Sequence, residues 1–235
     1  MVEAQIGVAK VSKYAVDESG DTLELIERPG GGLSVVLADG QRSGHSARII
    51  SNIVARKAVS LLGEGVRDGA AARAAHDYLR THRSGQVSAE LQIVSIDLQT
   101  LTLVISRNTH CPAYVLAPGE VRTLDAPSQP IGLYPHTRPV IEEVALQPDT
   151  YAVATTDGVC AAGSRRGLEM DLQGLLPAWV SEGPSAQALA DRILMHAVEL
   201  DEGRPADDTS VLVVAVTDAA GSEPRVRRLS AIFPL

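Results

Sequence analysis

Aspartate residues recur at the ends of apolar runs in this chain, and carboxylates placed there can bind metal ions. The run LSVVLAD ends at Asp39, and the run YAVATTD ends at Asp157. Asp207 and Asp208 come just before a third run, SVLVVAV, and Asp21 precedes TLELIE. A side chain at the end of a buried strand projects into the loop layer, where sites are usually built. These segments therefore supply candidate ligands.

Carboxylates brought together repel one another unless cations lie between them, and oxygen ligands select hard ions such as Mg²⁺ or Mn²⁺. Each segment taken alone has a simpler explanation. An Asp-Gly pair after a strand is ordinarily a turn, and an Asp-Asp pair is ordinarily part of a solvated loop. The hypothesis of a metal site therefore requires that these segments meet in one region of the fold.

Hydrophobic periodicity predicts the elements that would position these residues. Apolar runs and alternating patterns predict strands over residues 6–16, 22–27, 34–38, 91–93, 101–105, 114–117, 121–124, 140–146, 151–156 and 210–217. Helical spacing predicts two consecutive central helices, over 45–62 and 71–82, and a late helix from Pro184 toward Gly203. Many strands with helices in two separate groups indicate an α+β fold of antiparallel sheets covered by helices.

The acidic segments also resemble a known family when they are taken in order. SGD (19–21), LADG (37–40), PIGLYP (130–135), TTDGV (155–159) and DDTSVLVV (207–214) resemble the metal-dependent Ser/Thr protein phosphatases of the PP2C type. The similarity is greatest to the compact bacterial branch with SpoIIE, RsbU and RsbX, and it spans roughly residues 5–217. It implies an αββα sandwich of two antiparallel sheets flanked by helices, as one domain over residues 1–220, with 221–235 as a C-terminal tail or an edge strand.

The resemblance implies a site for two Mn²⁺ or Mg²⁺ ions that activate a water for direct attack on a phosphate monoester. Asp39 would bridge both ions, and Asp157 and Asp207 would act with it in catalysis. Asp208 would lie behind the ligands, because the family pattern Asp-Asn/Asp-x-Thr/Ser begins at Asp207. Asp21 would hold a metal-bound water. The implied metal ligands are Asp21, Asp39, the backbone carbonyl of Gly40, Asp157 and Asp207.

The chain departs from the pattern of larger family members in two places. Gln41 follows the Asp-Gly pair where those members often carry a histidine that could protonate the leaving oxygen. That proton could come instead from water or from a histidine, and the sequence leaves His45, His110 and His136 open for the role. The family stretch Asn-Ala-Gly-His-Pro reads NTHCP (108–112) here, a change that we interpret as structural.

The sequence also leaves three other interpretations open. Cys160 and Arg166 have the C-x5-R spacing of cysteine-dependent phosphatases, but Val159 stands where those enzymes carry a histidine. A second rival is a catalytically silent pseudophosphatase that binds a phosphoprotein. A third takes LSVVLAD as a Walker B strand, for which no partner P-loop is present.

Composition limits the class of protein and its partners. The chain has 235 residues with no linker-like stretch, 45% hydrophobic and 3% aromatic residues, and a formal net charge of −8. The negative charge argues against nucleic acid or an anionic membrane as partner, and no segment has the roughly 18 apolar residues of a membrane span. We therefore expect a soluble cytoplasmic protein, and the resemblance implies an enzyme of the stand-alone RsbX type. The resemblance also implies a substrate, a phosphorylated STAS-domain protein of a stressosome or partner-switching pathway.

Overall fold

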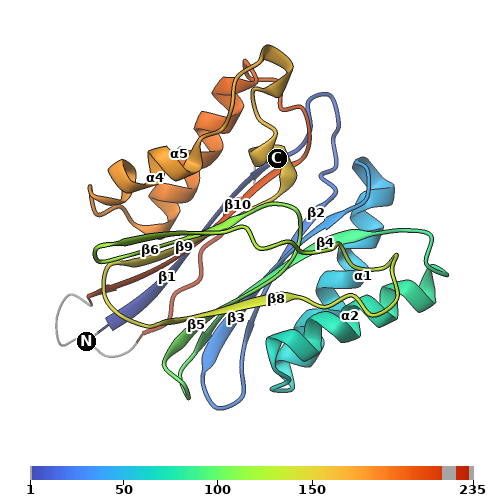
Figure 1. The fold of residues 1–235 in the computed structure, drawn as a ribbon, viewed down its shortest axis with the longest axis horizontal. Coiled ribbons are helices and arrows are strands. Elements are labelled where there is room, and N and C mark those ends of the chain that lie inside the picture. Colours follow the sequence, from blue (N-terminus) through green and yellow to red (C-terminus); the bar gives the residue numbers. More distant parts are fainter. Residues whose placement is uncertain (1, 219–225, 233–235) are drawn as a thin grey trace.

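The computed structural model describes residues 2–218 and 226–232, and two five-stranded antiparallel sheets form its centre (Figure 1). The first sheet has the order β1-β10-β9-β6-β7. Its strands are β1 (Val2–Val11), β6 (Ala113–Ala117), β7 (Glu120–Leu124), β9 (Thr150–Thr155) and β10 (Thr209–Asp218). This sheet joins the first and last strands of the described residues, with Val2 opposite Asp218.

The second sheet has the order β2-β3-β4-β5-β8. Its strands are β2 (Asp21–Glu27), β3 (Gly32–Gly40), β4 (Ala89–Asp97), β5 (Thr102–Asn108) and β8 (Val140–Ala145). Strands β2 to β5 are a simple antiparallel meander except that the two long helices interrupt it between β3 and β4. Every strand pair in both sheets is antiparallel.

Each sheet carries its own helical layer, on opposite outer sides of the sandwich in Figure 1. α1 (Gly44–Gly63) and α2 (Asp68–His82) cover the β2-β3-β4-β5-β8 sheet, whereas α4 (Leu172–Val180) and α5 (Ala186–Leu200) cover the other sheet. A four-residue helix, α3 (Asp157–Cys160), and a short 3-10 turn (Ser164–Arg166) follow β9. The α+β prediction and the αββα sandwich are therefore confirmed.

Three apolar clusters fill the spaces between these four layers. One lies under α4 and α5, another lies under α1 and α2, and the third lies between the two sheets. Val, Leu, Ile and Ala make up most of all three clusters, as the low aromatic content requires. The buried aromatic side chains of the described residues are Tyr114, Tyr151 and Trp179, and all three belong to the cluster under α4 and α5. Both sheets are thus packed on both faces.

The structure corrects some element boundaries. The first strand ends at Val11, not at residue 16, and the last helix begins at Ala186, because Ser185 accepts a hydrogen bond from the amide of Ala188 and caps the helix after Pro184. Helix α4 was not predicted. None of the helices in the described part of the chain has the length and apolar character that a bilayer span requires.

The described part of the C-terminal stretch, residues 226–232, has no regular secondary structure and is exposed. Arg227 forms an ion pair with Glu27 at the end of β2. The remainder of the predicted tail, 221–225 and 233–235, lies outside the described residues. The boundary at residue 220 therefore stays a prediction.

Candidate active site

Three carboxylates lie in one row across β2, β3 and β4. The antiparallel register places Asp21 directly opposite Asp39, and Asp39 directly opposite Glu90. Side chains that face each other across neighbouring strands project from the same side of a sheet. Asp21, Asp39 and Glu90 therefore share one end and one face of the second sheet.

Two more carboxylates come from the ends of strands in the first sheet. Asp157 begins α3 directly after β9, and Asp207 lies two residues before β10, which pairs with β9. Burial, together with the nearby charges of Asp21, Asp157, Glu90 and Asp207, raises the pKa of Asp39 to about 10. The acidic segments predicted from the sequence therefore meet in space.

Asp21 connects the two sheets at this end of the sandwich. Its Oδ2 atom accepts hydrogen bonds from Thr156 Oγ1 at 3.0 Å and Ser210 Oγ at 2.6 Å, both from the first sheet's side. Its Oδ1 atom is buried and has no hydrogen-bond partner among the described residues. Burial raises the pKa of Asp21 to about 6, although the hydrogen bond from Ser210 opposes this shift. One oxygen is thus structural, and the other is free to bind a cation or a water.

Asp207 and Asp208 have different surroundings. The carboxylate of Asp208 is buried, and it accepts hydrogen bonds from the backbone amides of Lys13 at 3.0 Å and Gly20 at 2.9 Å. The side chain of Asp207 is 41% exposed, and its Oδ1 lies 3.8 Å from Lys13 Nζ. Asp208 therefore holds together the loops behind the site, whereas Asp207 has a carboxylate available for a ligand.

The donor set and its charge fit divalent cations. Burial raises the pKa of Asp157, and the charges of Asp207 and Glu90 raise it further, while a hydrogen bond to Asp39 lowers it. Such mutual repulsion is relieved when a hard cation binds among carboxylate oxygens. Within the described ranges, however, no three acidic, histidine or cysteine side chains already converge on a common ion position. The fit to a metal thus rests on donor type, on charge and on the unpartnered oxygen of Asp21.

Basic side chains border the carboxylates. Lys10 Nζ and Arg48 Nη1 both donate to the backbone carbonyl of Asp21, at 2.9 and 2.5 Å. Burial lowers the pKa of Lys10, and the charge of Asp21 opposes this shift. These two cations offset part of the negative charge without occupying the carboxylate oxygens.

Two glycines allow the backbone to pack closely around the site. A Cβ atom on Gly40 would lie 2.0 Å from the carbonyl oxygen of Ala47 in α1. A Cβ atom on Gly158 would lie 2.2 Å from the carbonyl oxygen of Asp208. The Asp-Gly pairs are therefore more than turn signals, because each glycine lets a second segment approach the aspartate beside it.

Glu90 is the site residue that the sequence analysis missed. In the sequence it looks like an ordinary polar position at the start of a strand, AELQIV. The pairing of β3 with β4 could have revealed it, since this register sets Glu90 opposite Asp39. Glu90 also accepts hydrogen bonds from Thr109 Oγ1 and from the backbone amide of His110, which attach the β5–β6 loop to the site.

The three candidate histidines have separate surroundings. His110 is exposed beside Glu90, and His45 Nδ1 lies 2.9 Å from Glu18 Oε2 at the start of α1. His136 lines a hollow next to α2 with Arg73 and Arg138. His110 and His45 therefore border segments of the carboxylate site, and His136 belongs to a different surface.

The geometry disfavours a cysteine-dependent phosphatase. The guanidinium of Arg166 lies 3.2 Å from Glu202 and donates to the carbonyl of Leu200 at the end of α5. Cys160 Sγ instead lies 3.6 Å from Thr155 Oγ1. Cys160 and Arg166 of the C-x5-R motif thus contact different residues. The element directly after the cysteine is only a three-residue 3-10 turn.

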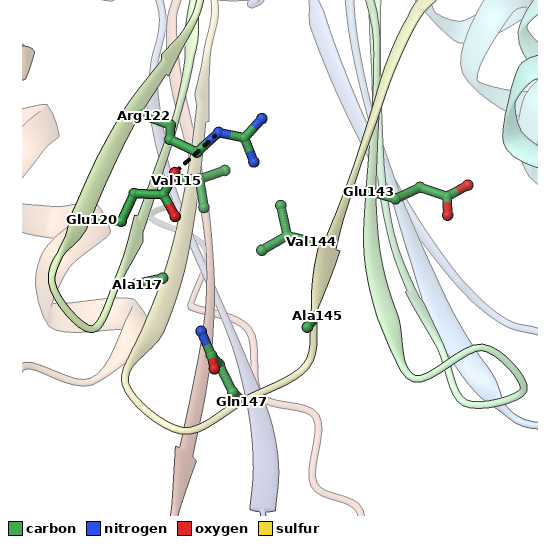
Figure 2. A pocket seen from close by; sticks show the side chains of 8 residues that line it. All are labelled: Val115, Ala117, Glu120, Arg122, Glu143, Val144, Ala145 and Gln147. Atoms are coloured by element: carbon green, nitrogen blue, oxygen red, sulfur yellow. Dashed lines mark ion pairs between the residues drawn. The ribbon is translucent and has the colours of Figure 1, made fainter.

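A hollow of about 220 Å³ lies between the edge strands β7 and β8 (Figure 2). Arg122 lies at its rim, 3.7 Å from Glu120 and 2.9 Å from Glu142. Ala145 lines it and pairs with Thr102, at the end of the sheet opposite to Asp39. This hollow is therefore separate from the carboxylates.

Comparisons with known proteins agree with this fold. A family model described as Stage II sporulation protein E (SpoIIE) matches residues 29–217, which is most of the chain. A sequence search of curated proteins gives no significant match.

Solved structures share the fold at low sequence identity. The PP2C phosphatase domain of SpoIIE from Bacillus subtilis, solved with a fragment of its regulatory domain, has a TM-score of 0.78 and 19% identity, over 94% of this chain and 65% of that one. This chain thus spans slightly less than two thirds of that protein's structure. RsbX in complex with magnesium has a TM-score of 0.70 and 15% identity, over 92% and 99% of the two chains. The catalytic domain of the Ser/Thr phosphatase PstP with two manganese ions has a TM-score of 0.68 and 17% identity, over 93% and 100%.

Proposed function

Because the chain belongs to the SpoIIE family and has the fold of PP2C phosphatase domains, we propose that it hydrolyses phosphoserine and phosphothreonine on a protein with the help of two divalent metal ions. The observation that carries this proposal is the meeting of carboxylates from both sheets at one end of the sandwich. Neither a turn nor a solvated loop requires that arrangement.

Asp39, the backbone carbonyl of Gly40, Asp157 and Asp207 would hold the metal ions, with Asp39 as the central ligand. Asp21 would use its free oxygen to hold a water beside the ions, and Asp208 supports the site by holding the backbone at Lys13 and Gly20. Glu90 adds a further carboxylate beside Asp39. Mn²⁺ or Mg²⁺ suits this donor set, and the PstP and RsbX structures contain these two metals.

The bound ions would neutralise the phosphoryl oxygens and lower the pKa of a water to about 7, so that it can attack phosphorus directly. The chain itself fixes the positions of its carboxylates. Thr156 and Ser210 hold one oxygen of Asp21, and Gln92 Nε2 donates to the carbonyl of Thr155 at 2.7 Å and ties the second sheet to β9. This rigidity keeps ligands from two sheets in one arrangement.

The test is Mn²⁺-dependent hydrolysis of p-nitrophenyl phosphate and of a phosphoserine peptide. We expect EDTA and Asp39→Asn each to lower the rate by about a hundredfold or more, because loss of a residue that only supports a metal ligand already costs about 10–100-fold. Cys160→Ser should keep nearly full activity, because the thiol has no part in this chemistry. Loss of activity in Cys160→Ser with EDTA resistance would contradict the proposal. A folded protein that binds phosphoprotein but hydrolyses neither substrate would instead be a pseudophosphatase.

For the natural substrate we propose a phosphorylated STAS-domain protein of a stressosome or partner-switching pathway, met in the cytoplasm. The support is the structural similarity of the chain to RsbX and to a solved protein of the bacterial stressosome. Release of phosphate from a panel of phosphorylated STAS proteins, followed by mass spectrometry, tests this assignment. If the enzyme released phosphate from none of these STAS proteins but did release it from other phosphoproteins, the assignment would be contradicted.

A further inference from the structure

Two free cysteines from distant parts of the chain meet beside the carboxylate site. Tyr114 pairs with Val153, so continuing this antiparallel register toward the site brings Cys111 beside the end of β9. Cys160 lies at the same place, because its sulfur lies 3.6 Å from Thr155 Oγ1 in the last position of β9. Each thiol shifts the pKa of the other, raising that of Cys111 and lowering that of Cys160, so the two groups lie next to each other. Neither is part of a disulfide.

The surroundings hold Cys111 in place and leave Cys160 the more accessible thiol. Arg107 Nη1 donates to the carbonyl of Cys111 at 2.8 Å, and the amide of Cys111 donates to Thr109 Oγ1 at 3.0 Å. Cys111 is 3% exposed, whereas Cys160 is partly exposed. We therefore expect a small oxidant to react with Cys160 first, and the buried thiol of Cys111 to react second.

We propose that Cys111 and Cys160 are a redox modification site that a peroxide such as hydrogen peroxide converts to a reversible disulfide. The Cys160 thiolate attacks one peroxide oxygen, the O–O bond breaks, and the departing hydroxide takes the thiol's proton to leave as water. Cys111 sulfur then attacks the sulfenic sulfur of Cys160. The S–S bond forms, the S–O bond breaks, and the hydroxide leaves as a second water with the proton of Cys111. Two thiols are oxidised by two electrons, and one peroxide is reduced to two waters.

The electrostatics support the order of these steps. The hydrogen bond from Cys111 lowers the pKa of Cys160, which favours the thiolate that attacks the peroxide. Hydrogen bonding to Cys160 and burial raise the pKa of Cys111, so this thiol is protonated until its partner has been oxidised.

The disulfide would connect two segments that carry site residues. Cys160 is the last residue of α3, whose first residue is Asp157, and Cys111 lies two residues after Thr109, which donates to Glu90. A disulfide draws its sulfurs to about 2.05 Å, well inside the distance of a contact between thiols. On the basis of the proposed function, we expect oxidation to weaken Mn²⁺ binding by about tenfold. This is the lower end of the loss of metal affinity seen when residues that support metal ligands are changed.

The primary test is peptide mapping of the full chain after treatment with hydrogen peroxide. Trypsin cuts after Arg107, Arg122 and Arg165, so the two cysteines fall in separate peptides, 108–122 and 123–165. We expect these peptides to be joined under non-reducing conditions and to separate after dithiothreitol. In Cys111→Ser, Cys160 should instead form a sulfenic acid that dimedone traps, and Cys160→Ser should give neither product.

Two results would overturn the proposal. One is the absence of the joined peptide in wild-type protein under conditions in which dimedone labels Cys160 of Cys111→Ser. The other is joined peptides found only between two chains, seen as a dimer on a non-reducing gel. Mapping requires no phosphatase activity, so its failure and the failure of the proposed function are distinguishable.

Discussion

Asp39 couples cation binding to proton release. In the folded chain burial and neighbouring carboxylates raise its pKa to about 10, whereas the carboxyl of an unfolded chain titrates near 3.8. Without divalent ions the native state therefore binds more protons than the unfolded state between these pH values. The contribution of Asp39 to the free energy of unfolding is therefore fully present below about pH 4. It is lost as the pH rises toward 10, by at most about 1.4 kcal/mol per pH unit for one proton.

We predict that urea unfolding in EDTA gives a falling free energy of unfolding from pH 5 to pH 9, and that Asp39→Asn flattens this slope. The amide removes the titrating carboxyl, so the variant should be more stable than wild type at pH 9. Mn²⁺ affinity of the wild type should rise over the same range, because the ion displaces the proton. Parallel slopes for the two proteins would show that Asp39 does not hold this proton.

Asp207 and Asp208 are neighbours with opposite predicted effects. Asp208→Ala leaves the partly buried amide of Lys13 and the buried amide of Gly20 without acceptors, and we expect it to lower the free energy of unfolding by about 2–4 kcal/mol. Asp207→Ala removes a half-exposed carboxylate, so it should leave stability in EDTA nearly unchanged and weaken Mn²⁺ binding. Chemical denaturation and calorimetric titration of both variants measure these effects, and an exchange of the two outcomes would reverse our assignment.

A site residue can be predicted from the sequence when the residues next to it in the chain form a recognisable pattern. Asp39 and Asp157 each end an apolar run and precede a glycine, so both strand end and close packing are visible in the sequence. Glu90 has no such neighbours, because its place beside Asp39 depends on which strands pair and in what register. Similarly, the contact of Cys111 with Cys160 depends on β6 lying next to β9.

At the scale of elements, α3 is positioned by the close approach of its backbone to the segment before β10. Gly158→Ala would place a methyl group 2.2 Å from the carbonyl oxygen of Asp208, so the helix that begins at Asp157 must move. We predict a destabilisation of about 1–3 kcal/mol and a loss of Mn²⁺ affinity, measured by thermal melts and calorimetric titration.

Gly63→Ala is the matched control for this change. Its added methyl meets only the flexible side chain of Ile26, at 3.2 Å, near the end of α1 and far along β2 from Asp21. Alanine also favours the helix, so stability should be unchanged or higher, with normal metal affinity. If Gly158→Ala bound Mn²⁺ as tightly as this control, α3 would not position a ligand.

The elements differ in how clearly the sequence predicts them. α1 and α2 have long apolar stripes and were predicted, whereas α4 has only nine residues and contains Pro177. Asp171, whose side chain caps α4 by accepting from the amide of Gly174, is the signal that could have revealed it. The pairing of β1 with β10 brings together the first and last strands of the described residues, and no local pattern shows it.

At the scale of the whole molecule, the two sheets and their helices should fold without the C-terminal stretch. Side chains such as Leu229 and Ile232 are 79% and 96% exposed, and the ion pair of Arg227 with Glu27 is a surface contact. We predict that a chain ending at residue 220 changes the free energy of unfolding by less than about 1 kcal/mol. Calorimetry and the phosphatase assay measure this, and loss of folding would extend the domain beyond residue 220.

The carboxylates lie where the two sheets meet, so a bound ion should link the sheets as well as fill a site. Ligands from β2, β3 and the segments after β9 and before β10 would all be held by the same ions. We predict that Mn²⁺ at about 100 times its dissociation constant stabilises the fold by about 2.7 kcal/mol, which corresponds to a rise in Tm of about 5–11 °C for a chain of this size.

Hydrogen exchange should slow in both sheets, at the ends near Asp39 and Asp157. In Asp39→Asn the rise in Tm should nearly vanish. An equal rise in wild type and variant, or protection confined to one sheet, would mean that the ions bind elsewhere.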